Sequence, residues 1–189
     1  DEIAEAEAVV HRLRTMEAAN PELSWGDMAV LYRTNAQSRS IEESLVRWSI
    51  PYIVVGGLRF YDRREIKDLL AYLRLLVNPA DTVSLLRVIN VPKRGIGKTT
   101  IQRLTDAANQ LGIPLWDVVS DAEAVRSLGG RSARGLLQFC ELLHDLRRQV
   151  QEVAPSELIQ QVMEKSGYVS ELIAEGTDEA EERRRNLQE

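Results

Sequence analysis

The sequence predicts an α/β fragment, a parallel βαβ piece, followed by an all-α helical part, so that the chain is predominantly helical overall. Two short apolar runs before residue 56 flank a segment with helical periodicity. This pattern is typical of two strands buried on both faces with a helix between them. After residue 80 the apolar residues recur at helical spacing, between Gly and Pro breaks. With 189 residues, 44% of them hydrophobic, the chain can bury a core.

The first helix is predicted over residues 1–19, where Ala6 and Val10 recur at helical spacing and acidic residues occupy the opening turn. Asn20-Pro21 ends this helix, because proline cannot continue it. The continuous apolar run over residues 28–32 then predicts the first strand.

The second strand is predicted over residues 50–55, and Gly56-Gly57 ends it. Between the two strands, Thr34 is placed to cap a helix, and Gln37 three residues later completes a capping box. A connection of this length joins two parallel strands by a right-handed crossover.

A domain boundary is predicted near residue 80. A helix that follows the capping pattern of Asp62 and Glu65 stops at Asn78-Pro79, and four or five further helices are expected after it. Residues 1–79 and 80–189 are therefore expected to form separate parts. Two strands do not complete a doubly wound sheet, so we expect the first part to be a piece of a larger fold.

Composition excludes several classes of protein. The net charge is −5, and no apolar run approaches the ~18 residues that a membrane helix needs. The opening residues have neither the basic start nor the apolar stretch of a signal peptide. One cysteine and two histidines exclude an internal disulfide framework and argue against a zinc cluster. We expect a cytoplasmic chain with no membrane contact and no metal site.

Cys140 and His144 lie four residues apart on a predicted helix and are a candidate dyad or pair of metal ligands. Leu136 and Leu143 mark the same face as core, and no further ligands complete a site. We therefore expect Cys140 to be a packing residue.

Basic residues are concentrated in one segment of this acidic chain. From Thr82 to Thr105 there are five basic residues and no acidic one, which leaves 19 basic against 29 acidic residues elsewhere. Binding of a polyanion depends on the local field rather than on the overall charge. The segment therefore predicts a nucleic-acid contact, with a solvated basic helix face as the alternative.

Residues 95–100, with the sequence GIGKTT, lie inside this segment and look like the end of a phosphate-binding P-loop. That loop needs a glycine five residues before Gly97, where this chain has Pro92, which has no amide hydrogen to donate. No apolar strand ends in an Asp-Glu pair that would hold magnesium. The segment is not expected to hydrolyse a nucleotide by itself.

A helix, a Gly-hydrophobic-Gly hairpin and a second helix explain the same residues better. Gly95 and Gly97 would let bare amides approach a phosphate, and the N-terminus of the second helix would favour the anion. Ile96 would pin the turn into the core. The cations that would add a salt-dependent attraction are Lys93, Arg94 and Lys98. An ordinary tight turn between two helices is the alternative.

Tyr32 and Arg33 form a second candidate site. Arg33 follows the carboxyl end of the first predicted strand, where open α/β sheets place their ligands. A guanidinium fork suits a phosphoryl group, and the Tyr32 ring could pack on a base. The alternative is an arginine that forms a salt bridge with a neighbouring acid.

Residues 29–39 (AVLYRTNAQSR) and 90–97 (NVPKRGIG) occur in this order in one known group of proteins. They resemble helicase motif IV and the duplex-contacting loop of the 2B subdomain in the bacterial UvrD/PcrA/Rep group, the superfamily 1A DNA helicases. Further segments that resemble this group are residues 50–52, 56–57, 60–61, 64–68, 70–74, 166–168 and 185–187.

The resemblance implies that residues 1–79 are the start of the second RecA-like domain, 2A, and that residues 80–189 are most of the inserted 2B subdomain. It implies that Tyr32 packs on the adenine of ATP and that Arg33 contacts the γ-phosphate as a catalytic residue. It maps the duplex-binding loop onto Lys93, Arg94, Gly95, Ile96, Gly97, Lys98 and Thr99.

The parent protein implied by the resemblance is an ATP-dependent 3′–5′ DNA helicase of DNA repair or replication. It would use ATP and Mg²⁺ and act on duplex DNA and on single-stranded/duplex junctions. Walker A, Walker B and motifs III, V and VI have no counterpart here, so subdomains 1A and 1B and the rest of 2A would supply them. This chain alone is expected to have no ATPase or helicase activity and to bind neither ATP nor Mg²⁺. The alternative is a non-enzymatic DNA-binding or protein-docking module that shares these segments.

Overall fold

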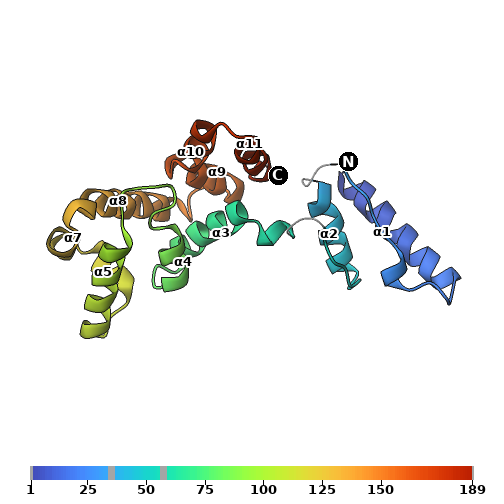
Figure 1. The fold of residues 1–189 in the computed structure, drawn as a ribbon, viewed down its shortest axis with the longest axis horizontal. Helices are drawn as coiled ribbons and strands as arrows, with labels where there is room; N and C mark the ends of the chain where they lie inside the picture. Colours follow the sequence, from blue (N-terminus) through green and yellow to red (C-terminus); the bar gives the residue numbers. More distant parts are fainter. Residues whose placement is uncertain (1, 34–36, 56–58, 189) are drawn as a thin grey trace. The chain divides into compact units, whose positions relative to one another are not determined.

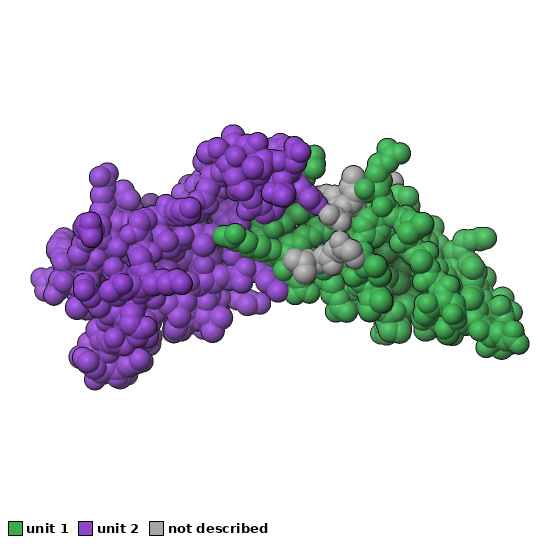
Figure 2. All heavy atoms as spheres, viewed as in Figure 1, with its two compact units in different colours: residues 1–66, 185–189 green, residues 67–184 purple. Residues whose placement is uncertain are grey.

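The computed structural model describes residues 2–33, 37–55 and 59–188 (Figure 1). The chain divides into two compact units, coloured separately in Figure 2: Asp1–Ile66 with Arg185–Glu189 make unit 1, and Lys67–Arg184 make unit 2. Two helices, α3 (Arg64–Val77) and α11 (Asp178–Asn186), each begin in one unit and end in the other. The prediction of a predominantly helical chain is confirmed. The assignment of residues 1–79 and 80–189 to separate subdomains stays a prediction.

Unit 1 is built on two helices, α1 (Glu2–Ala19) and α2 (Ser38–Arg47), which pack against each other. Val10 of α1 and Leu45 of α2 are buried together with Ile50 in its apolar core. Both helices predicted for this part of the chain are confirmed. Gln37 is the N-cap residue of α2 and makes no side-chain cap, so it does not have the place in the helix that the predicted capping box gives it. The described residues of unit 1 also form the short 3₁₀ turns η1 (Trp25–Asp27) and η3 (Phe60–Asp62).

The parallel βαβ arrangement predicted from residues 28–32 and 50–55 is not formed, since no segment within the described ranges pairs as a β-strand. Exposure instead alternates along both segments. Every second residue is partly covered, whereas Leu31, Ile53 and Val55 are 94%, 81% and 84% exposed. A strand needs a neighbouring strand for its backbone hydrogen bonds, and the described residues supply none to either segment.

Both segments line an open apolar hollow of about 740 Å³ within unit 1. Leu13 of α1 and Ile41 and Leu45 of α2 line it as well. The helices thus cover one side of each segment, and the other side is open to solvent. Continuous apolar runs predict burial on two faces, but a sequence run does not show what covers the second face.

A buried polar cluster joins distant parts of the chain within unit 1. Arg63 Nη1 donates to Asn186 Oδ1 (2.8 Å), and its Nη2 donates to Ser38 Oγ (2.9 Å). Asn186 Nδ2 in turn donates to Glu65 Oε1 (2.7 Å). All four side chains are buried. A buried polar group costs free energy unless it is hydrogen-bonded. Moving Asn186 away would leave Arg63 and Glu65 without these bonds, so the cluster holds Asn186 beside the start of α3.

Unit 2 consists of short helices around one apolar core. After residue 80 the described part of the chain contains eight α-helices, and not the four or five predicted. They are α4 (Thr82–Val88), α5 (Lys98–Leu111), α6 (Leu115–Ser120), α7 (Ala122–Leu128), α8 (Ala133–Gln149), α9 (Pro155–Lys165), α10 (Tyr168–Glu175) and α11. One extra helix arises at a joint without Gly or Pro, at Asp121, which ends α6 and caps α7. Another arises at Gly176, which ends α10 before α11.

Helix α8 is central to the core of unit 2, where it contacts α6, α7 and α9. Phe139, Leu143 and Leu146 on its inner side are at most 1% exposed. The Cys140 thiol is also buried and donates to the carbonyl oxygen of Val119 (3.0 Å). Burial raises the pKa of Cys140 to about 12, so the thiol stays protonated and unreactive. The predicted packing role of Cys140 is confirmed.

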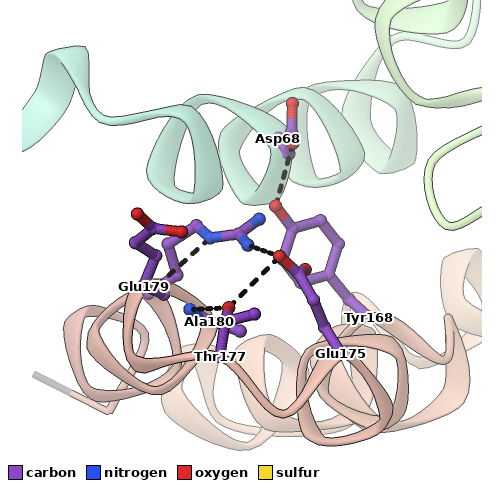
Figure 3. Close-up of polar contacts among 7 residues, drawn as sticks. Asp68, Tyr168, Glu175, Thr177, Glu179 and Ala180 are labelled. Atoms are coloured by element: carbon purple, nitrogen blue, oxygen red, sulfur yellow. Dashed lines mark hydrogen bonds and ion pairs between the residues drawn. The ribbon is translucent and has the colours of Figure 1, made fainter.

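Polar contacts fasten the C-terminal helices of unit 2 (Figure 3). The Tyr168 hydroxyl at the start of α10 donates to Asp68 Oδ2 of α3 (2.9 Å). Asp68 Oδ1 also pairs with Arg87 Nε of α4 (2.8 Å). Arg183 Nη2 of α11 lies 2.6 Å from Glu175 Oε1 at the end of α10. The buried carboxylate of Asp68 therefore ties both α10 and α4 to α3.

Candidate nucleic-acid interface

The side chain of Asn90 lies inside the loop between α4 and α5 and bonds two of its backbone amides. Asn90 Oδ1 accepts hydrogen bonds from the backbone amides of Arg94 (2.7 Å) and Ile96 (3.1 Å). Ile96 is 2% exposed and belongs to the core of unit 2, as the sequence predicts. Gly95 and Gly97, on either side of it, are exposed. The loop is thus anchored from inside and presents its glycines to solvent.

Gly97 leaves the first turn of α5 accessible. It is the N-cap residue, its backbone is extended (φ −83°, ψ 160°), and it provides no side-chain cap. Its carbonyl accepts the amides of Thr100 and Ile101 (3.1 Å each), which leaves the amides of Lys98 and Thr99 without an intrahelical partner. A Cβ placed on Gly97 would meet no atom within 4 Å. The helix end therefore offers backbone donors and a positive dipole to an anion.

The start of α8 packs directly against this loop. Ser132 Oγ donates to the Gly95 carbonyl oxygen (2.8 Å). A Cβ on Gly135 would lie 2.2 Å from the carbonyl oxygen of Arg94, so only glycine allows α8 to come so close. Sequence reasoning missed both Ser132 and Gly135. The one available signal was Gly135 itself, an isolated glycine within a helical pattern.

The five cations of the basic segment differ in their surroundings. Lys93, Lys98 and Arg103 are exposed, and the described residues give none of them an ion pair. Arg87, by contrast, is held by the buried carboxylate of Asp68. Three of the five are thus free to meet an anion from solvent.

The guanidinium of Arg94 is turned into unit 2. It donates to the carbonyl oxygens of Val88 (3.2 Å), Pro92 (3.0 Å) and Ser166 (3.2 Å). It also donates to the Tyr72 hydroxyl (2.6 Å), and burial raises the pKa of Tyr72 to about 12. Arg94 therefore holds the loop to the rest of unit 2, and its donors are engaged there.

One acidic residue reaches the loop from another part of the sequence. Glu171 Oε1 of α10 accepts a hydrogen bond from the backbone amide of Lys93 (3.2 Å). The sequence window from Thr82 to Thr105 contains no acid, so this contact was not predictable from it. Glu171 reduces the positive field at the Lys93 side of the loop, whereas no such contact is present at Lys98 among the described residues.

The second candidate site, Tyr32 and Arg33, belongs to unit 1. Tyr32 is half-buried and lines the apolar hollow, and Arg33 is exposed. The Arg33 amide donates to Gln37 Oε1 (3.0 Å), and in the described part of the chain its guanidinium forms no ion pair. The predicted cap Thr34 lies outside the described residues, as do Gly56 and Gly57.

Residues 2–33, 37–55 and 59–188 contain neither a candidate metal site nor a candidate membrane-spanning helix. No group of three His, Cys, Asp or Glu side chains in these ranges is placed to hold a metal ion. No helix in them combines the length and the hydropathy needed to cross a membrane.

Comparison with known proteins decides the family to which these elements belong. Residues 1–187 match the UvrD-like helicase C-terminal domain. The chain belongs to this family. The resemblance inferred from motif IV and from the Gly-Ile-Gly loop is therefore confirmed.

Several relatives of this UvrD-like domain are named ATP-dependent DNA helicase PcrA. The protein from Leuconostoc citreum is 42% identical over 167 residues, which are 88% of this chain and 22% of that protein. Those from Staphylococcus aureus (strain Mu50) and Staphylococcus epidermidis are each 40% identical over 185 residues, which are 98% of this chain and 25% of those proteins. The UvrD-like chain thus spans about a quarter of the length of these relatives.

Proposed function

We propose that this chain is part of an ATP-dependent 3′–5′ DNA helicase and that it supplies a duplex-binding surface which does not read sequence. The observation that carries the proposal is the uncapped first turn of α5, flanked by Lys93 and Lys98 and anchored by Ile96. Backbone amides and lysines recognise phosphates, which every base pair shares, so such a surface positions the duplex without specifying its sequence.

The donors are distributed so that two residues carry most of the attraction. Lys98 adds its charge to the two accessible amides of the helix end, and Lys93 approaches from the other side of Gly95. Arg94 acts indirectly, since its guanidinium holds the loop in place. We therefore assign phosphate binding to Lys93, Lys98 and the amides from Gly97 to Thr99.

For unit 1 we propose that residues 28–32 and 50–55 become strands of a RecA-like 2A subdomain when the rest of its sheet is present. The exposure of Leu31, Ile53 and Val55 supports this, because large apolar side chains on one side of an extended segment indicate a missing layer. The 2A assignment covers residues 1–79 and the 2B assignment residues 80–189.

In this 2A subdomain Tyr32 would pack on the adenine of ATP, and Arg33 would contact the γ-phosphate. The exposed guanidinium of Arg33 is compatible with this role. The described residues offer no metal-ligand set, so we assign the Mg²⁺ ligands to other parts of the intact protein.

The duplex-binding proposal is tested by salt titration of this chain with a fluorescent duplex. We expect Lys93→Ala and Lys98→Ala each to reduce the slope of log K against log[salt] by up to ~0.9, the value of one lost phosphate contact. Arg147→Ala is the matched control, because Arg147 is exposed near the far end of α8 and should leave the slope unchanged. Lysine variants that keep the parent slope would contradict the proposal.

In the same titration, Gly97→Val tests the contribution of the backbone amides to duplex affinity separately from that of the lysine charges. The backbone there is extended and the Cβ position is open, so the variant should fold and melt like the parent. The branched side chain would nevertheless obstruct a phosphate that approaches the amides. We expect a loss of affinity at every salt concentration with little change of slope, and unchanged affinity would show that the amides are not used.

We also expect the chain by itself to hydrolyse no ATP, because the nucleotide would meet only Tyr32 and Arg33 here. Phosphate release is measured with and without single-stranded DNA, on material free of full-length helicase. Turnover that co-purifies with this polypeptide through two different columns would contradict the division of roles proposed above.

A further inference from the structure

Gln37, the N-cap residue of α2, holds the backbone of Arg33. Its side chain caps no amide of α2. The Gln37 Oε1 atom instead accepts a hydrogen bond from the backbone amide of Arg33, four residues earlier in the sequence (3.0 Å). The oxygen that the predicted capping box assigned to the start of the helix is therefore used by the arginine proposed above to contact the γ-phosphate.

The start of α2 is a fixed point for this contact. Ser38, the next residue, is 1% exposed, and its Oγ accepts a hydrogen bond from Arg63 Nη2 (2.9 Å). Arg63 is itself buried, and its guanidinium also packs over the Phe60 ring, 5.2 Å from the ring centroid. Displacing Ser38 would leave a buried guanidinium nitrogen without this partner, which costs free energy. Gln37 is thus attached to a part of unit 1 that resists movement.

Arg33, by contrast, is weakly constrained by its own contacts. Its side chain is exposed, and in the described part of the chain the bond to Gln37 is its one polar contact. Tyr32, just before it, is half-buried and lines the apolar hollow. An exposed arginine side chain has many rotamers, so the direction of its guanidinium depends on the orientation of its own backbone. The Gln37 oxygen fixes that backbone at the residue where packing of the extended segment ends.

We propose that Gln37 is a positioning residue for ATP hydrolysis, whose carbonyl oxygen fixes the Arg33 backbone and thereby aims the guanidinium at the γ-phosphate. The proposal rests on the γ-phosphate role proposed above for Arg33, and it adds the residue that directs this arginine. A positive charge stabilises a transition state only when it is held where the negative charge develops. Losing the bond should therefore slow turnover, although the charge of Arg33 remains. Gln37 acts only through Arg33, and this separates it from a residue that supports the fold in general.

The contact is tested first on the full chain without nucleotide, by NMR measurement of hydrogen exchange at the Arg33 amide. Gln37→Met keeps the length of the side chain and removes the acceptor oxygen, so we expect this amide to exchange ~10-fold faster, as for one lost hydrogen bond. Gln37→Glu keeps an acceptor oxygen and should retain the slow exchange. The amide of Ser24, which donates to Asp27 Oδ2 (2.9 Å), is the internal reference and should not change. An Arg33 amide that exchanges equally fast in the parent and in Gln37→Met would overturn the proposal.

The role is tested in the intact helicase by steady-state ATP hydrolysis with saturating single-stranded DNA. We expect Gln37→Met to lower kcat by ~10-fold, the equivalent of one hydrogen bond. Affinity for a fluorescent ATP analogue and the melting temperature should not change, because Gln37 is exposed and touches no phosphate in this scheme. Gln160→Met is the matched control, since Gln160 is exposed on α9 in unit 2, and it should turn over like the parent. The double variant Arg33→Ala/Gln37→Met should be no slower than Arg33→Ala, because the guanidinium that Gln37 directs is already gone.

These outcomes separate the proposal from the one on which it rests. If Arg33→Ala lowers kcat and Gln37→Met turns over like Gln160→Met, the positioning role is overturned and the γ-phosphate role of Arg33 stands. If Gln37→Met slows the Arg33→Ala enzyme as much as it slows the parent, Gln37 acts by another route and its positioning role is again overturned. If Arg33→Ala keeps the parent kcat, the γ-phosphate role is overturned, and the positioning role is overturned with it.

Discussion

Replacing Arg33 by alanine in the intact helicase should lower kcat for ATP hydrolysis by ~10²–10³ and leave nucleotide affinity almost unchanged. A guanidinium aimed at the γ-phosphate stabilises charge that develops mainly in the transition state, so its loss is felt in turnover rather than in binding. The side chain is exposed and forms no ion pair in the described part of the chain. We therefore expect the melting temperature of the variant to match that of the parent.

Tyr32→Ala provides the comparison for this measurement. Packing of a ring on the adenine is equally strong in the ground state and the transition state, so its removal should raise KM for ATP and leave kcat close to the parent value. Steady-state kinetics with saturating single-stranded DNA distinguishes the two patterns. Normal turnover in the Arg33→Ala enzyme would mean that this arginine has a structural role only.

Gly135→Ala should destabilise unit 2 by about 1–3 kcal/mol and weaken duplex binding. The added methyl group would lie 2.2 Å from the carbonyl oxygen of Arg94, and backbone atoms cannot move aside without displacing the loop. Because Asn90 and Ser132 fix the loop on both sides of that carbonyl, the displacement would reach the first turn of α5. Urea unfolding and duplex titration of the same preparation measure the two effects.

Gly97→Ala is the matched control, since the same methyl group there would meet no atom within 4 Å and the φ of −83° suits any residue. We expect its urea midpoint to equal that of the parent. If Gly135→Ala unfolds at the parent midpoint as well, α8 does not constrain the loop in the way described.

The parts of the fold that depend on local pattern could be predicted from the sequence. The helices around Val10 and Leu45, the end of α3 at Asn78-Pro79 and the burial of Ile96 all follow from spacing and from breaks in the chain. The two strands could not be predicted in the same way. A strand requires a partner that local sequence does not name, and residues 28–32 have none among the described residues.

The candidate site also combines features that local sequence predicts with features that depend on distant residues. The Gly-Ile-Gly turn and its positive charge could be predicted, because they lie within one short stretch. The inward turn of Arg94 and the approach of Glu171 could not, because each depends on a residue more than 70 positions away. The sequence gives the number of basic residues in the segment, but only tertiary contacts determine which of their side chains face solvent.

The hydrogen bonds between Arg63, Glu65 and Asn186 set an order of events during synthesis. Unit 2 is one continuous stretch, Lys67–Arg184, so every residue that it needs has left the ribosome before Asn186 appears. Within unit 1 Arg63 can reach Ser38 earlier, but Asn186, which bonds both Arg63 and Glu65, comes 123 residues after Arg63. Unit 2 can therefore assemble co-translationally as an independent body, and unit 1 is completed last, by the final few residues of the stretch described here.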